Sequence, residues 1–260
     1  MTRFLGAIHS VRPNIVPPLT KVVNLSAPKS MTNWFDGIDF GAGSDPMLGN
    51  DKIGCCVPVS AYQIERTRAQ HVWGPSSFIP TTDQVLKIYS LFGYNPNDPT
   101  TDRGIDTVKF MTWWASKGLP LDNPADGTNA INLDVIAWAQ ASLQETPAAI
   151  DIAGPARITL ALPAALEGSP VSAWGDAPGT GDGWAAGTWG QHSVAAGGQK
   201  NGSLLIETWG ETVWAHPLFL ARYWLATDIA ASRLWFDTTG TAPSGVDWIT
   251  LLDAVSQLTP

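Results

Sequence analysis

The sequence predicts a single α+β domain, with helices in its first half and an antiparallel sheet in its second half. The 260 residues, 44% of them hydrophobic, are enough to form one sizeable core. Apolar residues recur at helical spacing in the first half, most regularly over residues 104–117. In the second half, two short apolar runs flank Asn201-Gly202, a pair typical of a tight hairpin turn.

Composition excludes several classes of function. A formal net charge of −8 and a pI near 4.8 argue against nucleic acid or an anionic membrane surface as a partner. No apolar run approaches the length of a membrane span, so we expect no membrane insertion. The first residues lack the continuous apolar segment of a secretion signal. We therefore expect a soluble protein, either cytoplasmic or part of a virion.

The chain divides into three predicted parts. Residues 1–46 are rich in Pro and Asn and predict an extended arm with strand-like pieces. Residues 47–236 form the main domain, and residues 237–260 form a linker followed by a short amphipathic helix. Thirteen Trp residues indicate many buried rings or contact surfaces.

The first helix is predicted to begin at the adjacent cysteines Cys55 and Cys56 and to extend to about His71. Pro58 suits a first helical turn, where its missing N–H costs nothing. Apolar side chains recur at helical spacing on the side expected to be buried, and three charged residues are expected to face water. These are Val57, Ala61 and Ile64 on the buried side, and Glu65, Arg66 and Arg68 on the other.

Two further helices are predicted in the first half. One has Thr82 as its expected N-cap residue and ends at Gly93. The other covers Gly104 to Lys117 and is closed by Gly118. Its apolar stripe consists of Ile105, Val108, Met111 and Trp114.

The second half alternates strands, a short helix and a loop. The predicted segments are a strand at 135–139, a helix at 146–153, a buried strand at 156–162, a long surface loop at 168–190, strands at 191–196 and 203–209, and further sheet with some helix at 214–236.

Two loops are predicted to be plain turns. The polar loop at 94–102 lacks the ordered ligand spacing of a calcium site. The Gly-rich stretch at 179–183 lacks the preceding strand and following helix of a phosphate-binding loop. We therefore predict no metal and no cofactor.

The adjacent cysteines are the first candidates for chemistry. A helix N-terminus favours a thiolate through its free N–H groups and its dipole. The alternative for either residue is a small buried side chain, which is the commoner role of a free cysteine. A disulfide between sequence neighbours would be strained, so the chain is not expected to depend on one.

Four histidines can be sorted by context. His9 lies in the arm, His71 lies near a helix end and His216 precedes a proline, so structural roles are expected for these three. His192 opens a strand directly after a glycine-rich loop, where its side chain can face a groove. A cysteine at a helix start followed distantly by a strand histidine is the arrangement of thiol hydrolases.

At this point the sequence resembles a known family, the papain-like cysteine peptidases. It is most similar to a divergent bacterial and phage branch whose nucleophile motif reads Gly-Asn-Asp-x-x-Gly-Asp-Cys. Residues 49–56 match that motif except that Cys55 replaces its second Asp. Residues 191–198 resemble the His-Ala-Val strand of the family, and Glu207-Thr208-Trp209-Gly210 resembles its Asn-Ser-Trp-Gly.

The resemblance implies a fold and a set of roles. The fold would be papain-like, with a helical subdomain packed on an antiparallel β-sheet or barrel subdomain. Cys56 would be the nucleophile, His192 the general base and Glu207 the group that orients the histidine, in the place of the family's Asn. Asn50 and the Cys56 backbone N–H would stabilise the oxyanion.

Two functions remain open from the sequence. The first is a cysteine peptidase or amidase that acts on a peptide or a peptidoglycan stem peptide. The second is a catalytically inactive papain-like fold that contacts neighbouring subunits of a phage particle, because a fold can outlast its activity. Substitution of Asp by Cys55 and of Asn by Glu207 leaves both open.

Overall fold

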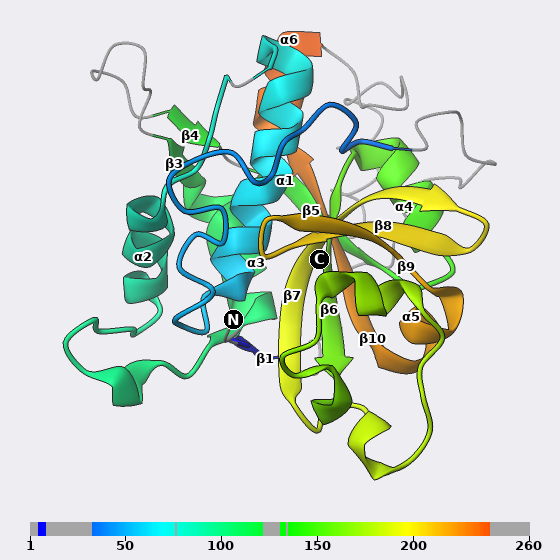
Figure 1. The fold of residues 1–260 in the computed structure, drawn as a ribbon. Helices are drawn as coiled ribbons and strands as arrows, with labels where there is room; N and C mark the ends of the chain where they lie inside the picture. The colour runs from blue at the N-terminus through cyan, green and yellow to red at the C-terminus, as the bar shows by residue number, and fades with distance from the viewer. Residues whose placement is uncertain (1–4, 9–32, 76, 122–130, 134, 240–260) are drawn as a thin grey trace, which may run out of the picture.

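The computed structural model describes residues 5–8, 33–75, 77–121, 131–133 and 135–239 (Figure 1). A six-stranded antiparallel sheet with strand order β5-β10-β6-β7-β8-β9 packs against a helical part. Helix α1 lies between the sheet and α2 (Figure 1). The mixed α+β architecture predicted from the sequence is confirmed.

The helices and short helical turns lie in the following places. The helices are α1 Cys56–Trp73, α2 Thr82–Leu91, α3 Thr107–Lys117, α4 Thr146–Ala153, α5 Pro217–Tyr223 and α6 Arg233–Thr239. The 3₁₀ turns are η2 Pro99–Thr101, η3 Ala164–Leu166, η4 Val171–Gly175 and η5 Asp182–Trp184.

The strands form one large sheet and two small pairs. The large sheet contains β5 Val135–Ala141, β6 Ala156–Leu162, β7 Gly190–Lys200, β8 Ser203–Thr208, β9 Glu211–Ala215 and β10 Trp224–Ser232. The pairs are β1 Ala7–Ile8 with β2 Ile105–Asp106, which is parallel, and β3 Leu119–Leu121 with β4 Ile131–Leu133, which is antiparallel.

Helix α1 begins where the sequence predicts, but its charged residues do not face solvent. Glu65, Arg66 and Arg68 are all buried, so the prediction that they face water is wrong. Arg68 pairs with Glu65 at 2.5 Å and also donates to backbone carbonyls, and Ser232 donates to the second Glu65 oxygen. A central helix covered on all sides keeps charges only where they are paired and hydrogen-bonded.

The next two helices differ from prediction at their first residues. Thr81, not Thr82, is the N-cap of α2, and it forms a reciprocal capping box with Gln84. Helix α3 starts at Thr107 because the Asp106 carboxylate accepts the N–H of Lys109 and caps it. Ile105, assigned by periodicity to the helix, lies in strand β2.

The β7–β8 hairpin follows the sequence closely. Asn201 and Gly202 both have positive φ (52° and 80°), as a type I′ turn requires, and Lys200 pairs with Ser203. Between Ala196 and Gly198 the register shifts by one residue, which marks a β-bulge at Gly197. Because of the bulge, the β8 side chains that lie on the same face of the sheet as a given residue at the start of β7 are not those that an unbulged pairing would place there. They are the alternate set.

Of the remaining predictions for the second half of the chain, some are confirmed and one is only partly correct. Residues 146–153 and 156–162 are the helix and the buried strand as predicted, and 135–139 lies within β5. The 168–190 segment is not wholly a surface loop, because η4 inserts Trp174 into the core with 1% exposure. The predicted C-terminal helix, most of the arm and His9 lie outside the described residues.

Helices long and apolar enough to cross a bilayer are absent from the described part of the chain.

Candidate active site

The loop before α1 is shaped by two left-handed residues and one carboxylate. Leu48 and Gly49 have φ values of 52° and 84°, a conformation that glycine adopts freely and leucine only when held. The Asp45 carboxylate accepts the Gly49 N–H at 3.0 Å and the Thr82 hydroxyl at 2.7 Å. These contacts fix the loop so that the chain enters α1 at Cys56.

Cys56 is the first helical residue and is fully buried against the sheet. Its sulfur accepts the backbone N–H of Ser193 at 3.4 Å, so it lies against β7 at the residue that follows His192. Burial raises the pKa of the Cys56 thiol to about 11. Backbone N–H groups of Ser193 and Gly6, and the charge of Arg157, act in the opposite direction.

Cys55 has a different environment from its neighbour. It is the N-cap residue of α1, and its sulfur donates to the Leu48 carbonyl at 3.7 Å. Burial raises its pKa well above the usual value, and the nearby Cys56 adds to the shift. Both cysteines are free thiols. Cys55 therefore packs beneath the loop, whereas Cys56 faces the sheet.

His192 lies on β7, buried in a cage of aromatic rings. Its ring stacks on Trp209 with centroids 4.3 Å apart and meets Trp174 edge-on at 6.2 Å. Its Nε2 atom lies 2.7 Å from the Thr208 hydroxyl. Thr208 thus contacts one of the two ring nitrogens of His192, and Nδ1 is the other.

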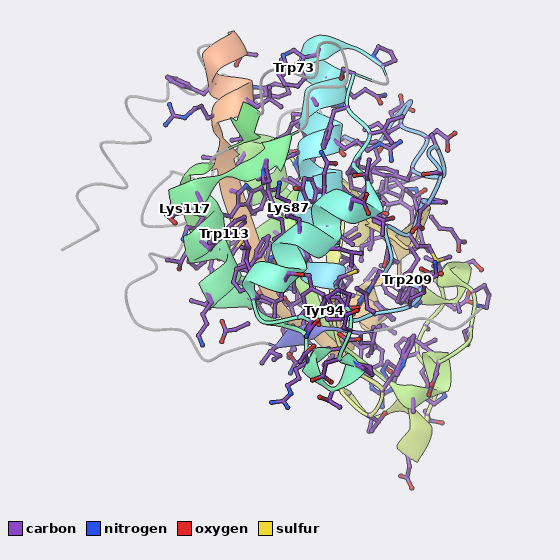
Figure 2. All side chains as sticks on the ribbon, turned by 90° about the vertical axis from the view of Figure 1, so that its left-hand side faces the viewer. Trp73, Lys87, Tyr94, Trp113, Lys117 and Trp209 are labelled. Carbon is purple, nitrogen blue, oxygen red and sulfur yellow. The ribbon has the colours of Figure 1, made fainter. Side chains whose placement is uncertain are left out.

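Trp209 is held in an unusual backbone conformation. Trp209 and Gly210 form the two-residue turn between β8 and β9, and both have positive φ (52° and 77°). The left-handed conformation is costly for a bulky residue, and the surrounding ring stack maintains it. Figure 2 shows Trp209 far from the exposed Trp73, which lies at the other end of α1.

Glu207 does not make the contact with His192 that the resemblance implies. Its carboxylate accepts the Gly210 N–H at 3.3 Å, inside the β8–β9 turn. Burial raises its pKa to about 8, against the Gly210 N–H and the charge of Arg66, which lower it. Glu207 therefore contacts the β8–β9 turn, whereas Thr208 is the residue of β8 that contacts the His192 ring.

The Gly197 bulge explains why Thr208, and not Glu207, contacts His192. If the Lys200–Ser203 register continued along β7 without a bulge, Glu207 and His192 would lie on the same face of the sheet. The bulge shifts the pairing so that Ala195 opposes Glu207, and Thr208 takes the face of His192. A glycine pair at 197–198 was the only sequence signal of this change.

Asn50 is buried, and its side-chain N–H donates to the carbonyl of Ile53 at 2.9 Å. This contact ties the amide to the loop three residues before Cys56. An amide nitrogen carries two protons, so the Ile53 bond occupies one of its two donors. The oxyanion role of Asn50 stays a prediction.

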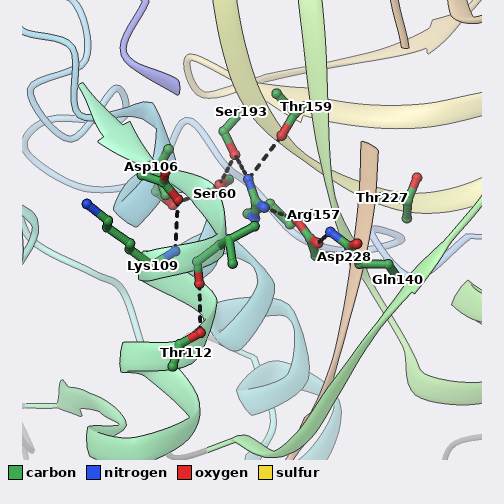
Figure 3. Close-up of polar contacts among 12 residues, drawn as sticks. Ser60, Asp106, Lys109, Thr112, Gln140, Arg157, Thr159, Ser193, Thr227 and Asp228 are labelled. Atoms are coloured by element: carbon green, nitrogen blue, oxygen red, sulfur yellow. Dashed lines mark hydrogen bonds and ion pairs between the residues drawn. The ribbon is translucent and has the colours of Figure 1, made fainter. Parts of the chain in front are cut away.

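A buried polar network that the sequence did not reveal joins α1 to the sheet (Figure 3). It includes Ser193, whose backbone N–H contacts the Cys56 sulfur. Ser60 on α1 shares a 2.8 Å hydrogen bond with Ser193, and Arg157 on β6 donates to Ser193 at 3.1 Å. Arg157 also forms an ion pair with Asp228, which accepts from Gln140. The network fixes the position of β7 relative to α1.

In the described part of the chain, no group of three or more His, Cys, Asp or Glu side chains is arranged to hold a metal ion.

This chain has the fold of the papain-like cysteine proteases. It is similar to xylellain, a cysteine protease from Xylella fastidiosa, at 12% identity and a TM-score of 0.64, over 88% of this chain and 96% of that one. It is also similar to proCathepsin B S9 from Trypanosoma congolense, at 11% identity and a TM-score of 0.55, over 89% and 87%. No family model matches the sequence, and no curated protein sequence does.

Proposed function

We propose that the protein is a cysteine hydrolase that cleaves peptide or related amide bonds, with Cys56 as nucleophile and His192 as general base. The main support is the contact between the Cys56 sulfur and the Ser193 N–H. This contact brings the start of α1 to β7 at the residue next to the buried histidine. A protease-like fold supports the same reaction class.

In the proposed reaction, Nδ1 of His192 takes the thiol proton and the Cys56 sulfur attacks the carbonyl carbon of the substrate. The resulting imidazolium returns that proton to the departing amine, which leaves a thioester on Cys56. Water, deprotonated by His192, then hydrolyses the thioester and restores the thiol. Thr208 acts as a positioning residue by holding Nε2.

Oxyanion stabilisation is assigned to Asn50 and the backbone N–H of Cys56, as the resemblance implies. Removal of one such donor typically costs about 3 kcal/mol of transition-state stabilisation. The 2.9 Å bond from Asn50 to Ile53 supports a fixed orientation of that amide near the start of α1.

We further propose, from the resemblance alone, that the gene belongs to a phage or prophage and that the substrate is a protein or a peptidoglycan stem peptide. The alternative function is a non-catalytic subunit of a phage particle. A buried thiol with a pKa near 11 favours this alternative, because a neutral thiol is a weak nucleophile.

Incubation of the full chain with a peptide digest, followed by mass spectrometry of new termini, tests the proposal. Cleavage is expected from a Leu5→Asp chain, which displaces the segment whose Gly6 backbone contacts the Cys56 sulfur, and from the same chain with Cys55→Ala, which removes the neighbouring thiol. Cys56→Ala and His192→Ala are expected to abolish it. Cleavage that persists in Cys56→Ala, or its absence from both the wild type and a Leu5→Asp variant, would reject hydrolysis.

A further inference from the structure

Ser193 contacts the first turns of α1 at two points. Its backbone N–H donates to the Cys56 sulfur at 3.4 Å, and its hydroxyl shares a 2.8 Å hydrogen bond with Ser60. Side chains at the spacing of Cys56 and Ser60 share one face of a helix. The position of the Ser193 N–H against the sulfur therefore depends on how the Ser193 side chain is held.

The hydrogen bonds of this contact have a defined direction. Ser60 donates its hydroxyl to the Val57 carbonyl at 2.9 Å. A hydroxyl carries one proton, so the bond between the two serines is donated by Ser193 and accepted by Ser60. The Ser193 oxygen in turn accepts an N–H of Arg157 at 3.1 Å. The hydrogen bonds thus run from Arg157 towards the helix, with the positive group at their start.

Arg157 reaches Ser193 along one face of the sheet (Figure 3). Arg157 and Thr159 are two residues apart on β6, so their side chains leave the same face, and Thr159 pairs with Ser193 in the β6–β7 ladder. The Nη1 atom of Arg157 donates to both hydroxyls, at 3.1 Å each. Because the Arg157 side chain is 1% exposed, its guanidinium is fixed inside the protein next to the residue that contacts the Cys56 sulfur.

The acidic partner of Arg157 binds a different nitrogen of the guanidinium. Asp228 on β10 forms an ion pair with Nη2 and also accepts from the Gln140 side chain, whereas Nη1 binds Ser193. A charge inside a protein acts more strongly than the same charge in water, because the effective dielectric constant is lower. The charge of Arg157 lowers the pKa of Cys56, against the burial that raises it.

The Leu5–Ile8 segment covers the thiol. The Gly6 N–H is hydrogen-bonded to the Cys56 sulfur. Leu5 packs closely over the first residue of β7, because a Cβ atom on Gly190 would lie 3.1 Å from its side chain. A carboxylate at this apolar contact would be costly, so Leu5→Asp is expected to displace the segment.

Titratable groups approach the thiol from three elements. Cys55 is the N-cap residue of α1, His192 precedes Ser193 on β7, and Arg157 lies on β6. The Leu5–Ile8 segment has no titratable side chain. Among these groups, Arg157 carries a permanent positive charge.

We propose that Arg157 is a positioning residue for the nucleophile: acting through Ser193, it holds the β7 N–H against the Cys56 sulfur and stabilises the thiolate. The inference deepens the proposed function and rests on it for its catalytic meaning. Loss of the guanidinium is expected to make Cys56 harder to ionise and slower to react.

Alkylation by iodoacetamide as a function of pH tests the proposal, because the thiolate is the form that reacts. The parent chain carries Leu5→Asp, which uncovers the thiol, and Cys55→Ala, which leaves Cys56 as its one cysteine. Mass spectrometry of the peptide that contains Cys56 gives the rate from about pH 7 to about pH 10. Arg157→Met with Asp228→Leu, added to this parent, removes the guanidinium without leaving its carboxylate partner buried and unpaired.

The added pair of substitutions is expected to slow alkylation at least about tenfold at each pH below the thiol pKa. Arg157→Lys keeps a positive charge and should recover part of the rate. A merely structural role of Arg157 predicts the opposite sign, since a loosened fold exposes the sulfur and speeds its labelling. Unchanged or faster alkylation in the chain without the guanidinium would overturn the proposal.

The matched control is Glu65→Leu with Arg68→Met in the same parent, which removes another buried ion pair of α1. The hydrogen bonds of that pair go to Ser232 and to backbone carbonyls of other elements. The control is expected to lose stability in urea but to keep the alkylation profile of the parent. A slowing equal to that caused by loss of Arg157 would show that any buried ion pair has this effect, and would reject the proposal.

The outcome is separable from that of the proposed function. Slower alkylation without Arg157, in a parent chain that cleaves no peptide, would support the contact of Arg157 with the thiolate and reject hydrolysis. Peptide cleavage by the parent, together with an alkylation profile that does not depend on Arg157, would support hydrolysis and reject the role of Arg157.

Discussion

The Nε2 atom of His192 lies 2.7 Å from the Oγ1 atom of Thr208, across a hairpin whose register is shifted by the bulge at Gly197. The Thr208 hydroxyl and the stacked Trp209 ring together hold the His192 ring in one orientation. A hydroxyl can serve a neutral or a protonated imidazole, because it both donates and accepts. This contact and its neighbours lead to four predictions.

In a Leu5→Asp chain, whose N-terminal segment no longer covers Cys56, Thr208→Ala should lower kcat/KM for peptide cleavage by about tenfold or more, because the base loses its orienting hydrogen bond. Thr208→Ser keeps the hydroxyl and should recover most of the activity. Glu207→Gln, on the opposite face of β8, should have a smaller effect than Thr208→Ala. Steady-state kinetics with pH profiles would check this, and the reverse order of the two effects would return the orienting role to Glu207.

Glu207 should make the free energy of unfolding fall as the pH rises from about 4.5 to about 8. Burial raises its folded pKa to about 8, so folding favours the protonated form, and ionisation opposes folding. The expected loss is on the order of 5 kcal/mol across the interval. Urea unfolding at several pH values measures it. Glu207→Gln should flatten this part of the profile, and an unchanged slope would refute the assignment.

Arg157→Met should destabilise the fold by about 3–5 kcal/mol, because it leaves the Asp228 carboxylate buried without its ion pair. Arg157→Met combined with Asp228→Leu should recover part of that loss. Lys87→Met, on an exposed part of α2, provides the surface control. Chemical denaturation measures all three, and a loss in Arg157→Met no larger than that of Lys87→Met would contradict the role of the network.

Alkylation of Cys56 by iodoacetamide should be at least about a hundredfold slower than that of free cysteine at pH 8, from thiolate fraction alone. Burial holds the thiol neutral, and Gly6 covers it. The rate should rise as the pH approaches 11. Cys55→Ala isolates the signal for peptide mapping, and labelling of the wild type at the rate of a free thiol would rule out the occluded state.

Segments with a single strong pattern could be predicted from the sequence. The Asn201-Gly202 turn, the 146–153 helix and the 156–162 strand each form where local propensity and apolar run agree. The prediction that the charged residues of α1 face water failed, because periodicity cannot show that a helix is enclosed on every side. Periodicity also cannot predict hydrogen bonds between residues far apart in the chain, such as the one between Glu65 and Ser232.

The candidate site was predictable only in part. Motif spacing singled out Cys56 and His192, and the contact of Cys56 with Ser193 supports their proximity. Thr208 was missed because its orientation depends on a bulge, and Arg157 because its partners come from other strands. Gly6 was missed because a lone glycine in the first residues carries no signal until its neighbours are known.

Because the Leu5–Ile8 segment is tethered to the site that it covers, it acts at an effective concentration fixed by the chain itself. Dilution of the protein therefore leaves the Cys56 thiol covered. A free ligand with micromolar affinity for the uncovered site would show a weaker apparent affinity in any assay of the intact chain, because it competes with the segment. Uncovering requires an event that removes the tether or holds the segment elsewhere.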